Sequence, residues 1–495
     1  MKRRDFIQKV AIGSTLPFWL QGCDLSGLSS FPIEFRSAQN TGHLIRESLN
    51  WPKTNGGSTE TLIVGGGLAG LAAAYTLKNR PFELFELSDR FGGTASSTNL
   101  NGINICQGAH YDLDYPSYYG EEVLGLLEEL DIIEYQPWKK MWSFLDRQHL
   151  IPGNRRQQCF ENGKIRGDVI PEGKIKKQFL EIIRSYEGQL PMPTRLTAPE
   201  LQKLDKVDFL SFLKERMAVD GDLERHLDYH MMDDYGGITS QVSALAGLHY
   251  FGCRPYYRKH VELFSPPDGN AYFVNRITPR LPQQHLHLNH VVAKIERSGD
   301  GFEVTVLDVH NKRTQTWKAE RVVYAGQKHA LKFIFPEEAH LFEDNEYAPW
   351  MVINFVSPQE ANSYGKWQNE YLGEDPSFLG FIDSSVQDQS QLNDQRVFTA
   401  YYCLEPKDRE YLSTIVDHQK EIVQSTLTKI EKFLDRKIAV KTSGIHVMGH
   451  AMAIPKPGFL FPDFSQSQLQ YAGVDAGRLP LLFEALDSGV IAAQG

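Results

Sequence analysis

Cysteine is scarce in this chain, and its spacing fits neither a metal site nor a disulfide framework. The 495 residues contain five cysteines, with no CxxC pair and no nearby group of cysteine and histidine. Structural zinc sites and small disulfide-rich folds both need such close, repeated spacings. We therefore predict no metal site, and we expect the cysteines to be mainly small, buried apolar residues.

Excess positive charge is also missing. The formal net charge is -10 at pH 7, whereas nucleic acids and anionic membrane surfaces recruit proteins through basic patches. A general affinity for either is excluded unless a local patch departs from the overall charge. The sequence has no internal repeat and no low-complexity tract. Its 41% hydrophobic and 23% charged content predicts an ordinary folded chain with room for two domains.

Long apolar runs are absent beyond the N-terminus, so we expect that the mature chain does not span a membrane. The segment 1–23 begins with Lys2, Arg3 and Arg4 and then runs through a mostly uncharged stretch to Leu20. This pattern resembles a twin-arginine signal, which implies the bacterial export machinery as a partner. The alternative is an amphipathic N-terminal helix that happens to carry two arginines.

The end of that segment, residues 20–23, resembles the lipobox of bacterial lipoproteins, in which the cysteine is acylated after cleavage. Gln21 departs from the small residue usual there, so simple cleavage and an uncleaved anchor stay open beside acylation of Cys23. Asp24 resembles the residue that keeps such lipoproteins at the inner membrane. The resemblance implies a protein that reaches the periplasm already folded and is anchored to the outer face of the inner membrane.

Residue patterns divide the rest of the chain into interleaved pieces. Residues 61–64 and 82–86 have the composition of strands and residues 68–77 that of a helix, which predicts a β-turn-α-β unit and a parallel sheet. The predicted organisation is a signal at 1–23 and a linker at 24–58, which is an extended tether or surface strap. It continues with cofactor-domain pieces at 59–119, 265–335 and 456–495, and substrate-domain pieces at 120–264, mainly helical, and 336–455.

The turn after the first predicted strand carries the pattern GxGxxG. In such a turn the first glycine allows the tight bend, the second lets backbone approach a pyrophosphate, and the third permits close helix–strand contact. The following helix offers free N–H groups and a partial positive charge to phosphates. A carboxylate at the end of the next strand accepts hydrogen bonds from ribose hydroxyls. The predicted dinucleotide site comprises Gly65, Gly66, Gly67, Leu68, Ala69, Gly70 and Glu86.

Three further segments separate FAD from NAD. Residues 89–94 are similar to the DRxGG run of the flavin amine oxidase superfamily, which includes monoamine and polyamine oxidases, protoporphyrinogen oxidase and phytoene desaturase. Residues 289–295 with 321–325 resemble that family's strands by the adenine and toward the flavin, and residues 469–493 resemble its C-terminal flavin motif. The resemblance implies FAD contacts from Arg90, Gly92, Gly93, Thr94, Val292, Gly473, Asp475 and Leu482.

The same resemblance implies the fold and the form of the cofactor. We expect an α/β fold, with a Rossmann-like FAD-binding domain of the two-dinucleotide-fold type and an interleaved α+β substrate domain. The C-terminal motif has no cysteine where monoamine oxidases carry one, so FAD is expected to be non-covalent. A helix across 481–489 is expected to point its N-terminus at the flavin ring, where it would stabilise negative charge on reduction.

Catalytic side chains are harder to assign, because the flavin ring itself accepts the hydride. Many amine oxidases carry a lysine on a strand that residues 350–356 resemble, but this chain has Asn354 there. Lys456 precedes the C-terminal motif and either faces the flavin or is a solvated lysine in a proline-bounded loop. His110 and Tyr111 resemble the segment beside the ring, and the alternative for that histidine is a hydrogen-bonded core position.

Two other pairs are better explained without catalysis. His249 and Tyr250 follow an apolar run, so core packing is preferred. Asp233 and Asp234 have no third ligand near them in sequence, so a helix-end or capping role is preferred to a metal site.

The sequence therefore predicts an FAD-dependent oxidoreductase of the bacterial envelope that oxidises a small molecule, with an amine or polyamine as the first hypothesis for the substrate. Oxygen, or a quinone or other redox partner, would accept the electrons. Two alternatives stay open. One is oxidation or desaturation of an apolar polycyclic or isoprenoid compound, which a cleft without acids would favour. The other is a flavin-fold protein that binds without turnover.

Overall fold

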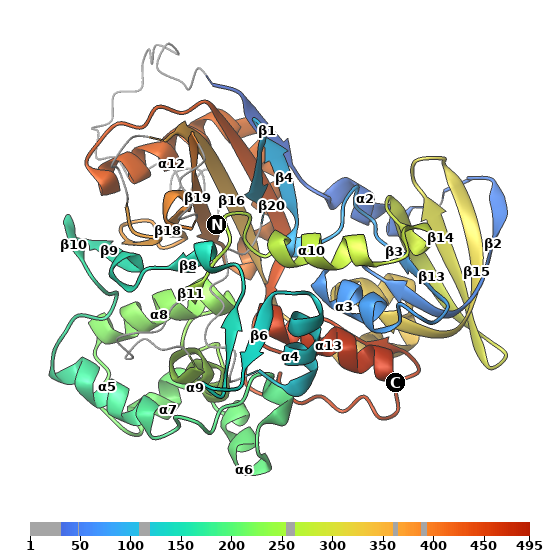
Figure 1. The fold of residues 1–495 in the computed structure, drawn as a ribbon, viewed down its shortest axis with the longest axis horizontal. Helices are drawn as coiled ribbons and strands as arrows, with labels where there is room; N and C mark the ends of the chain where they lie inside the picture. Colours follow the sequence, from blue (N-terminus) through green and yellow to red (C-terminus); the bar gives the residue numbers. More distant parts are fainter. Residues whose placement is uncertain (1–30, 48, 108–118, 254–262, 360–364, 388–393) are drawn as a thin grey trace.

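The computed structural model describes residues 31–47, 49–107, 119–253, 263–359, 365–387 and 394–495. Two large sheets lie side by side in the molecule (Figure 1). The first sheet, with β2 and β13 to β15, is at the right of that view, and the second, with β16 and β18 to β20, is at the upper left. A group of helices lies below the second sheet.

The first sheet forms around a parallel unit whose strands are apolar on both faces. Residues 61–64 of β2 are buried and pair in parallel with β3 on one side and β15 on the other. The strand, turn and helix predicted at 61–86 are confirmed, with α3 at Leu68–Thr76. In spatial order the strands are β12 (Leu286–His287), β3 (Phe82–Phe85), β2 (Lys53–Val64), β15 (Arg313–Tyr324), β14 (Gly301–Asp308) and β13 (His290–Ser298), and β21 (Gln470–Tyr471) also pairs with β15.

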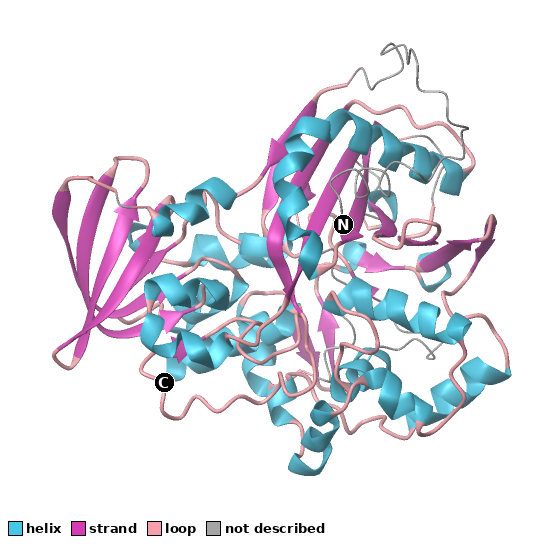
Figure 2. Ribbon diagram, turned by 180° about the vertical axis from the view of Figure 1, so that it is seen from behind, coloured by secondary structure: helices cyan, strands magenta, loops and turns pink. Residues whose placement is uncertain are grey.

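The second sheet is mixed and joins segments from four distant parts of the chain. Its central strands β16 and β19 are buried along almost their whole length, as expected for strands covered on both faces. Helix α12 covers one face, where Ile422, Val423 and Leu427 pack in one apolar cluster with Phe355 and Phe398 of the sheet (Figure 2). In spatial order the strands are β1 (Ile33–Arg36), β20 (Thr442–Ala453), β16 (Tyr347–Pro358), β19 (Gln395–Cys403), β18 (Phe378–Asp383), β17 (Gln368–Leu372), β9 (Gln157–Glu161) and β10 (Lys164–Arg166).

Helices surround these sheets and fill the space between them. The C-terminal helix α13 packs along α3 of the first sheet, and Gly489 allows this contact because a Cβ there would lie 2.1 Å from the carbonyl oxygen of Ala69. Besides α3, the α-helices of the described residues are α2 (Gln39–His43), α4 (Glu121–Glu129), α5 (Lys174–Arg184), α6 (Pro199–Gln202), α7 (Phe209–Lys214), α8 (Gly221–Tyr235), α9 (Ala244–Cys253), α10 (Ala271–Ile277), α11 (Leu331–Ile334), α12 (Gln419–Leu434) and α13 (Leu482–Gln494).

The segment predicted to be a linker contains regular structure. Residues 33–36 form β1, which pairs in parallel with β20 from Ile33 opposite Ser443 to Arg36 opposite His446. The chain then forms α2 and the short 3-10 helix η2 (Leu44–Arg46), and it enters β2 at Lys53, six residues before the predicted domain start at 59. Composition alone missed these elements because Ser, Gly and Asn are frequent there, and pairing with a distant strand supplies the order that local propensity lacks.

The substrate-domain piece 120–264 is less helical than predicted. It contains the hairpin β6 (Ile133–Gln136) with β7 (Met141–Phe144), as well as β9 and β10, and β8 (Leu150–Ile151) pairs with β11 (Leu263–Phe264). A further hairpin is β4 (Ser97–Leu100) with β5 (Ile103–Cys106). In the described part of the chain, no helix has the length and apolar character needed to cross a membrane.

Candidate cofactor and substrate cavity

One cavity of about 1330 Å³ lies between the two sheets. Nearly all of the predicted cofactor residues line it, although they come from segments far apart in the sequence. Gly66 and Gly70 are the exceptions. The lining residues from that prediction are Gly65, Gly67, Leu68, Ala69, Glu86, Arg90, Gly92, Gly93, Thr94, Val292, Gly473, Asp475 and Leu482.

The three glycines of the GxGxxG turn have different reasons to be glycine. Gly65 has a φ of 98°, which favours glycine, and a Cβ on Gly70 would lie 1.9 Å from the carbonyl oxygen of Gly65. Gly67 has an ordinary φ of -69°, and the nearest heavy atom to a Cβ there would be 3.9 Å away. Packing therefore does not require glycine at 67, whereas a ligand close to that backbone does.

Glu86 is hydrogen-bonded to the GxGxxG turn. Its carboxylate accepts hydrogen bonds from the N–H of Gly66 at 2.6 Å and of Ser88 at 2.8 Å. Burial raises the pKa of Glu86, and these N–H donors oppose that shift. The carboxylate lines the cavity with acceptor capacity left, which suits ribose hydroxyls.

The DRxGG run reaches the cavity next to this turn. Gly92 has a φ of 119°, and a bridge joins it to Gly67. Arg90 donates to the carboxylate of Asp89 at 2.8 and 2.9 Å and to the carbonyl oxygen of Ser97 at 2.9 Å. The arginine therefore holds the loop in shape as well as lining the cavity.

Asp475 in the C-terminal motif binds several neighbouring groups through its carboxylate. Its carboxylate accepts hydrogen bonds from the backbone N–H of Lys328 at 2.8 Å, from Lys328 Nζ at 3.0 Å and from the hydroxyl of Tyr347 at 3.0 Å. The Lys328 side chain has no exposed surface, and burial lowers the pKa of its ammonium group while Asp475 opposes that shift. Asp475 lines the cavity, and it ties together the loops after β15 and β21.

The predicted C-terminal helix is confirmed and is longer than expected, Leu482–Gln494. Its first turn, with Leu482 and Ala485, lines the cavity, and so does the first turn of α3, with Leu68. Neither helix has a side-chain cap. Two helix N-termini without a side-chain cap therefore face one cavity, an arrangement that attracts anionic groups.

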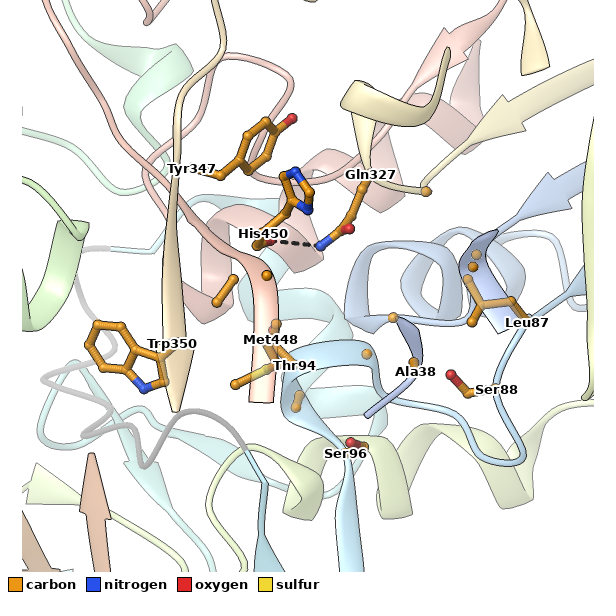
Figure 3. A pocket seen from close by; sticks show the side chains of 18 of the residues that line it. Ala38, Leu87, Ser88, Thr94, Ser96, Gln327, Tyr347, Trp350, Met448 and His450 are labelled. Atoms are coloured by element: carbon orange, nitrogen blue, oxygen red, sulfur yellow. Dashed lines mark hydrogen bonds between the residues drawn. The ribbon is translucent and has the colours of Figure 1, made fainter. Parts of the chain in front are cut away.

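Strand β20 supplies the facing wall, which sequence inspection did not identify. Its alternate residues His446, Met448, His450 and Met452 all line the cavity. In Figure 3, His450 lies between Tyr347 and Gln327, and the amide of Gln327 donates to the carbonyl oxygen of His450 at 2.7 Å. The period-2 run HVMGHAM was the available signal, because every second residue of a strand faces one side.

The histidines of this wall are held neutral. Burial lowers the pKa of His446 to about 4 and that of His450 to about 3. His446 donates from Nδ1 to the carbonyl oxygen of Gln107 at 2.6 Å, which leaves Nε2 as an acceptor. The rings of His329 and His450 stack with centroids 3.7 Å apart, and burial lowers the pKa of His329 to about 4.

Aromatic and acidic side chains line the part of the cavity on the side of the second sheet. The rings of Trp350 on β16 and Tyr401 on β19 stack with centroids 6.2 Å apart, and both line the cavity. Asp233 and Asp234, in the last turn of α8, line it as well, and Gln368 donates to Asp233 at 3.2 Å. Both acids lie at a helix end, as predicted, but it is the C-terminal end, which Gly236 closes in the left-handed region, so they do not cap a helix N-terminus.

The residues that the sequence suggested for catalysis either do not line the cavity or lie outside the described residues. Lys456 does not line the cavity and instead pairs with Glu346 at 3.1 Å on the surface. Asn354 is buried away from it, where it donates to the carbonyl oxygen of Cys106 at 2.9 Å. His110 and Tyr111 lie outside the described residues.

The predicted pair His249 and Tyr250 lies in the core. His249 contacts the carbonyl oxygen of Pro191 at 3.0 Å inside the core, as predicted. Tyr250 shares a 2.9 Å hydrogen bond with His230. The described ranges contain no group of three His, Cys, Asp or Glu side chains arranged for a metal ion.

The N-terminal segment 35–46 forms part of the cavity wall, although it was predicted to be an extended tether or a surface strap. Phe35, Arg36, Thr41 and Arg46 are among its lining residues. The segment leaves the second sheet at β1 and enters the first sheet at β2, so it crosses between the sheets beside the cavity (Figure 1). Arg46 stacks over the ring of Phe333 at 5.1 Å, which fixes its far end.

The residues of the cavity fit FAD. Gly67 leaves room where a Cβ would point, Glu86 offers a buried acceptor, and two helix N-termini suit the phosphates and the ring. Two buried nitrogens among the lining residues, Arg36 Nε and His329 Nδ1, lack a hydrogen-bond partner among the described residues, as expected where a polar ligand completes a site. None of the described cysteines lines the cavity.

Solved structures share this fold. Putrescine oxidase bound to putrescine is 14% identical with a TM-score of 0.61 and covers 90% of this chain and 98% of its own. Cyclohexylamine oxidase from Brevibacterium oxydans is 15% identical with a TM-score of 0.61, covering 88% and 98%. A putative protoporphyrinogen oxidase from Exiguobacterium is 15% identical with a TM-score of 0.59, covering 90% and 99%.

At these identities the likeness to solved structures shows the fold, and the family follows from the sequence. No curated protein sequence matches the chain significantly. The profile of one family, flavin containing amine oxidoreductase, matches residues 68–461. That match spans most of the chain and runs from the GxGxxG turn through the substrate-domain sheet. The chain therefore belongs to the flavin-containing amine oxidoreductases, a family of FAD-dependent oxidoreductases.

Proposed function

We propose that this protein oxidises a small primary amine or diamine with non-covalently bound FAD. One observation carries the proposal: the cavity that begins at the GxGxxG turn is also lined by the stacked rings of Trp350 and Tyr401 and by the acids Asp233 and Asp234. Aromatic faces and carboxylates attract an ammonium group. The acids argue against an apolar polycyclic or isoprenoid substrate, which a cleft without charge would suit better.

FAD, when bound, supplies the hydride acceptor for carbon–nitrogen bond oxidation. The chain's own residues bind and orient the amine and exclude water, since most of the chamber wall is aromatic or apolar. The histidines of β20 are neutral at pH 7 and so add no positive charge of their own to this wall. The structural relatives named for putrescine and cyclohexylamine support an amine of this size.

An anaerobic titration tests the substrate class. The purified yellow protein is mixed with putrescine, with cyclohexylamine and with a nonaromatic alcohol, and flavin bleaching is followed. Reduction by an amine alone is expected, and reduction by the alcohol alone would contradict the proposal. A flavin that no donor bleaches would favour a binding protein without turnover. Repeating the titration in air and with a soluble quinone identifies the electron acceptor.

The acids can be tested with a matched pair on one helix. Asp233→Asn is expected to lower the rate of flavin reduction by putrescine at a fixed low concentration by roughly 10-fold, because a carboxylate near the ammonium is lost. Asp222→Asn, at an exposed position of the same helix, is expected to leave it unchanged. Equal rates in the two variants would exclude Asp233 from amine binding.

We further propose that the enzyme works in the bacterial envelope. The proposal rests on the twin-arginine pattern at Arg3 and Arg4 and on the lipobox-like Cys23, which all lie outside the described residues. Conversion of both arginines to lysine is expected to keep the protein in the cytoplasm, and normal periplasmic yield would contradict it. Cys23→Ser is expected to abolish acyl labelling.

Acid precipitation tests the non-covalent state of the flavin. It should release the flavin to the supernatant, since none of the described cysteines lines the cavity.

A further inference from the structure

Trp138 projects from the molecule at the tip of a hairpin far from the cavity chemistry. It is 78% exposed, and among the described residues no other large hydrophobic side chain is exposed as much. It lies in the turn between β6 and β7, after Pro137 and before Lys139. Burial of a tryptophan side chain contributes more free energy than burial of an average side chain. A tryptophan that is 78% exposed at the tip of a hairpin therefore suggests a binding partner.

The hairpin carries one aromatic face that becomes more exposed toward this tip. At its base Ile133 pairs opposite Phe144, and both are buried. One step on, Tyr135 pairs opposite Trp142 with ring centroids 5.3 Å apart, and Tyr135 is 46% exposed. Because alternate residues share a face, this apolar face continues from the core into solvent.

The tip is also locally basic in a chain whose net charge is -10. Lys139 and Lys140 are both exposed, and neither takes part in an ion pair among the described residues. The acid of the hairpin, Glu134, lies nearer its base and accepts a hydrogen bond from Gln136 at 3.2 Å. Positive charge therefore lies beside the exposed tryptophan and not beside the carboxylate.

We propose that the β6–β7 hairpin is a docking site for the surface of an anionic phospholipid bilayer. Tryptophan and tyrosine side chains prefer the headgroup level of a membrane, where the ring is apolar on one side and wet on the other. Adjacent lysines are attracted by anionic headgroups. The local patch supplies the exception that the negative net charge otherwise excludes.

A protein partner fits these observations less well. A stable protein interface buries on the order of 800 Å² on each side, which is more than one hairpin tip with a few apolar side chains offers. Interfacial insertion needs only such a tip. The hairpin residues do not line the cavity, so the docking is independent of the substrate proposed above and of acylation at Cys23.

Vesicle sedimentation tests the proposal on the full chain carrying Cys23→Ser, which cannot be acylated. The probe is phosphatidylcholine vesicles, either pure or with phosphatidylglycerol as about a third of the lipid. We expect binding to the anionic vesicles, and a roughly 5- to 10-fold lower partition coefficient for Trp138→Ser and for Lys139→Glu with Lys140→Glu. Added salt should weaken binding of the parent more than that of the lysine variant.

The hairpin β9–β10 provides a matched control. Its Ile165 is 53% exposed and follows an exposed lysine, but it has no aromatic tip. Lys164→Glu with Ile165→Ser is expected to bind like the parent. Equal partition of the parent and the Trp138→Ser variant would overturn the proposal, as would an equal loss in both hairpins.

Fluorescence gives a second, direct measurement. Brominated anionic lipid should quench part of the tryptophan emission of the parent, and the quenched part should disappear in Trp138→Phe. The chain has seven tryptophans, so the comparison uses the difference between the two proteins. Identical quenching would overturn the proposal. A Trp138→Ser variant that changes sedimentation velocity without lipid, while vesicle binding stays the same, would replace it with a protein–protein contact.

Discussion

The two walls of the cavity are built in different ways. Much of the wall on the first sheet comes from one part of the chain, residues 64–96, whose glycines and acid follow each other in a fixed order. The facing wall takes residues 446–453 of β20, isolated residues such as Trp350 and Tyr401, and the N-terminal segment. A turn that binds phosphate depends on local backbone freedom, whereas a wall of alternating side chains depends on which face of a strand meets the cavity.

The largest expected effect concerns Asp475, which belongs to both walls. Asp475→Ala leaves the buried Lys328 ammonium without its carboxylate, so we expect the free energy of unfolding of the apoprotein to fall by about 3–5 kcal/mol. The same variant is expected to weaken FAD binding by about 1–3 kcal/mol, because a hydrogen-bonded contact at the cofactor site is lost. Urea unfolding and FAD titration measure the two quantities separately.

Two variants calibrate that result. Asp463→Ala removes an acid on the surface, bonded locally to Ser465, and is expected to change neither quantity. Asp475→Ala with Lys328→Met is expected to recover much of the stability, because no charge stays buried. Unchanged apoprotein stability with weakened FAD binding would show that the carboxylate acts on the cofactor rather than on Lys328.

The next effect separates ligand contact from packing within one motif. Gly67→Val is expected to weaken FAD binding by roughly 100-fold or more, because the side chain takes the place of the pyrophosphate. Apoprotein stability should change little, since valine can adopt the φ of -69° and a Cβ meets no atom within 3.9 Å. Flavin fluorescence titration and thermal unfolding of the apoprotein measure both.

Gly70→Ala is the contrasting variant. Its Cβ would lie 1.9 Å from the carbonyl oxygen of Gly65, so the apoprotein should lose about 1–3 kcal/mol of stability. If Gly67→Val destabilises the apoprotein as much as Gly70→Ala does, the space at Gly67 serves packing and the cofactor argument fails.

A smaller effect tests the N-terminal segment as part of the facing wall. Hydrogen exchange of residues 35–46 is expected to slow by roughly 10-fold when FAD is added to the apoprotein, because a ligand that binds only the closed wall suppresses local opening. Residues 53–58, on the outer part of β2, should exchange at the same rate in both forms. Equal exchange of residues 35–46 with and without FAD would show that the segment lies beside the site without closing it.

The smallest effect is the pH dependence of the β20 wall. Burial holds the pKa of His446 at about 4, below the unfolded value of about 6.5, so the unfolded state binds more protons between these pH values. Its contribution is fully present above about pH 6.5 and is lost as pH falls toward 4. The apoprotein should therefore lose on the order of 1 kcal/mol through this residue between about pH 7 and pH 5.

The check is His446→Asn, which should lessen that loss. His310→Asn, at an exposed position, should keep it. Buried Glu86 acts in the opposite direction, because its raised pKa makes the native state bind more protons. A pH profile of unfolding that is identical in the parent and in His446→Asn would contradict a buried neutral histidine.

Local order in the sequence was enough for the cofactor end of the molecule. The strand, turn, helix and acid at 61–86 need only neighbouring residues to define them, and so do the α13 helix and its place in the family motif. All the residues that the sequence predicted for FAD therefore line the cavity, except Gly66 and Gly70. Gly66 donates a hydrogen bond to Glu86, and Gly70 packs on the carbonyl oxygen of Gly65, so both stabilise the turn without lining the cavity.

Tertiary structure alone decided the rest. It moved Lys456 to a surface ion pair, turned Asn354 away from the cavity, and brought Asp233 and Asp234 to it, because a loop's direction and a helix's rotation are set by packing rather than by composition. It also made a strand and a cavity wall from a segment with the composition of a tether. Pairing between Arg36 and His446 joins residues some 400 positions apart, and no local pattern encodes a partner at that distance.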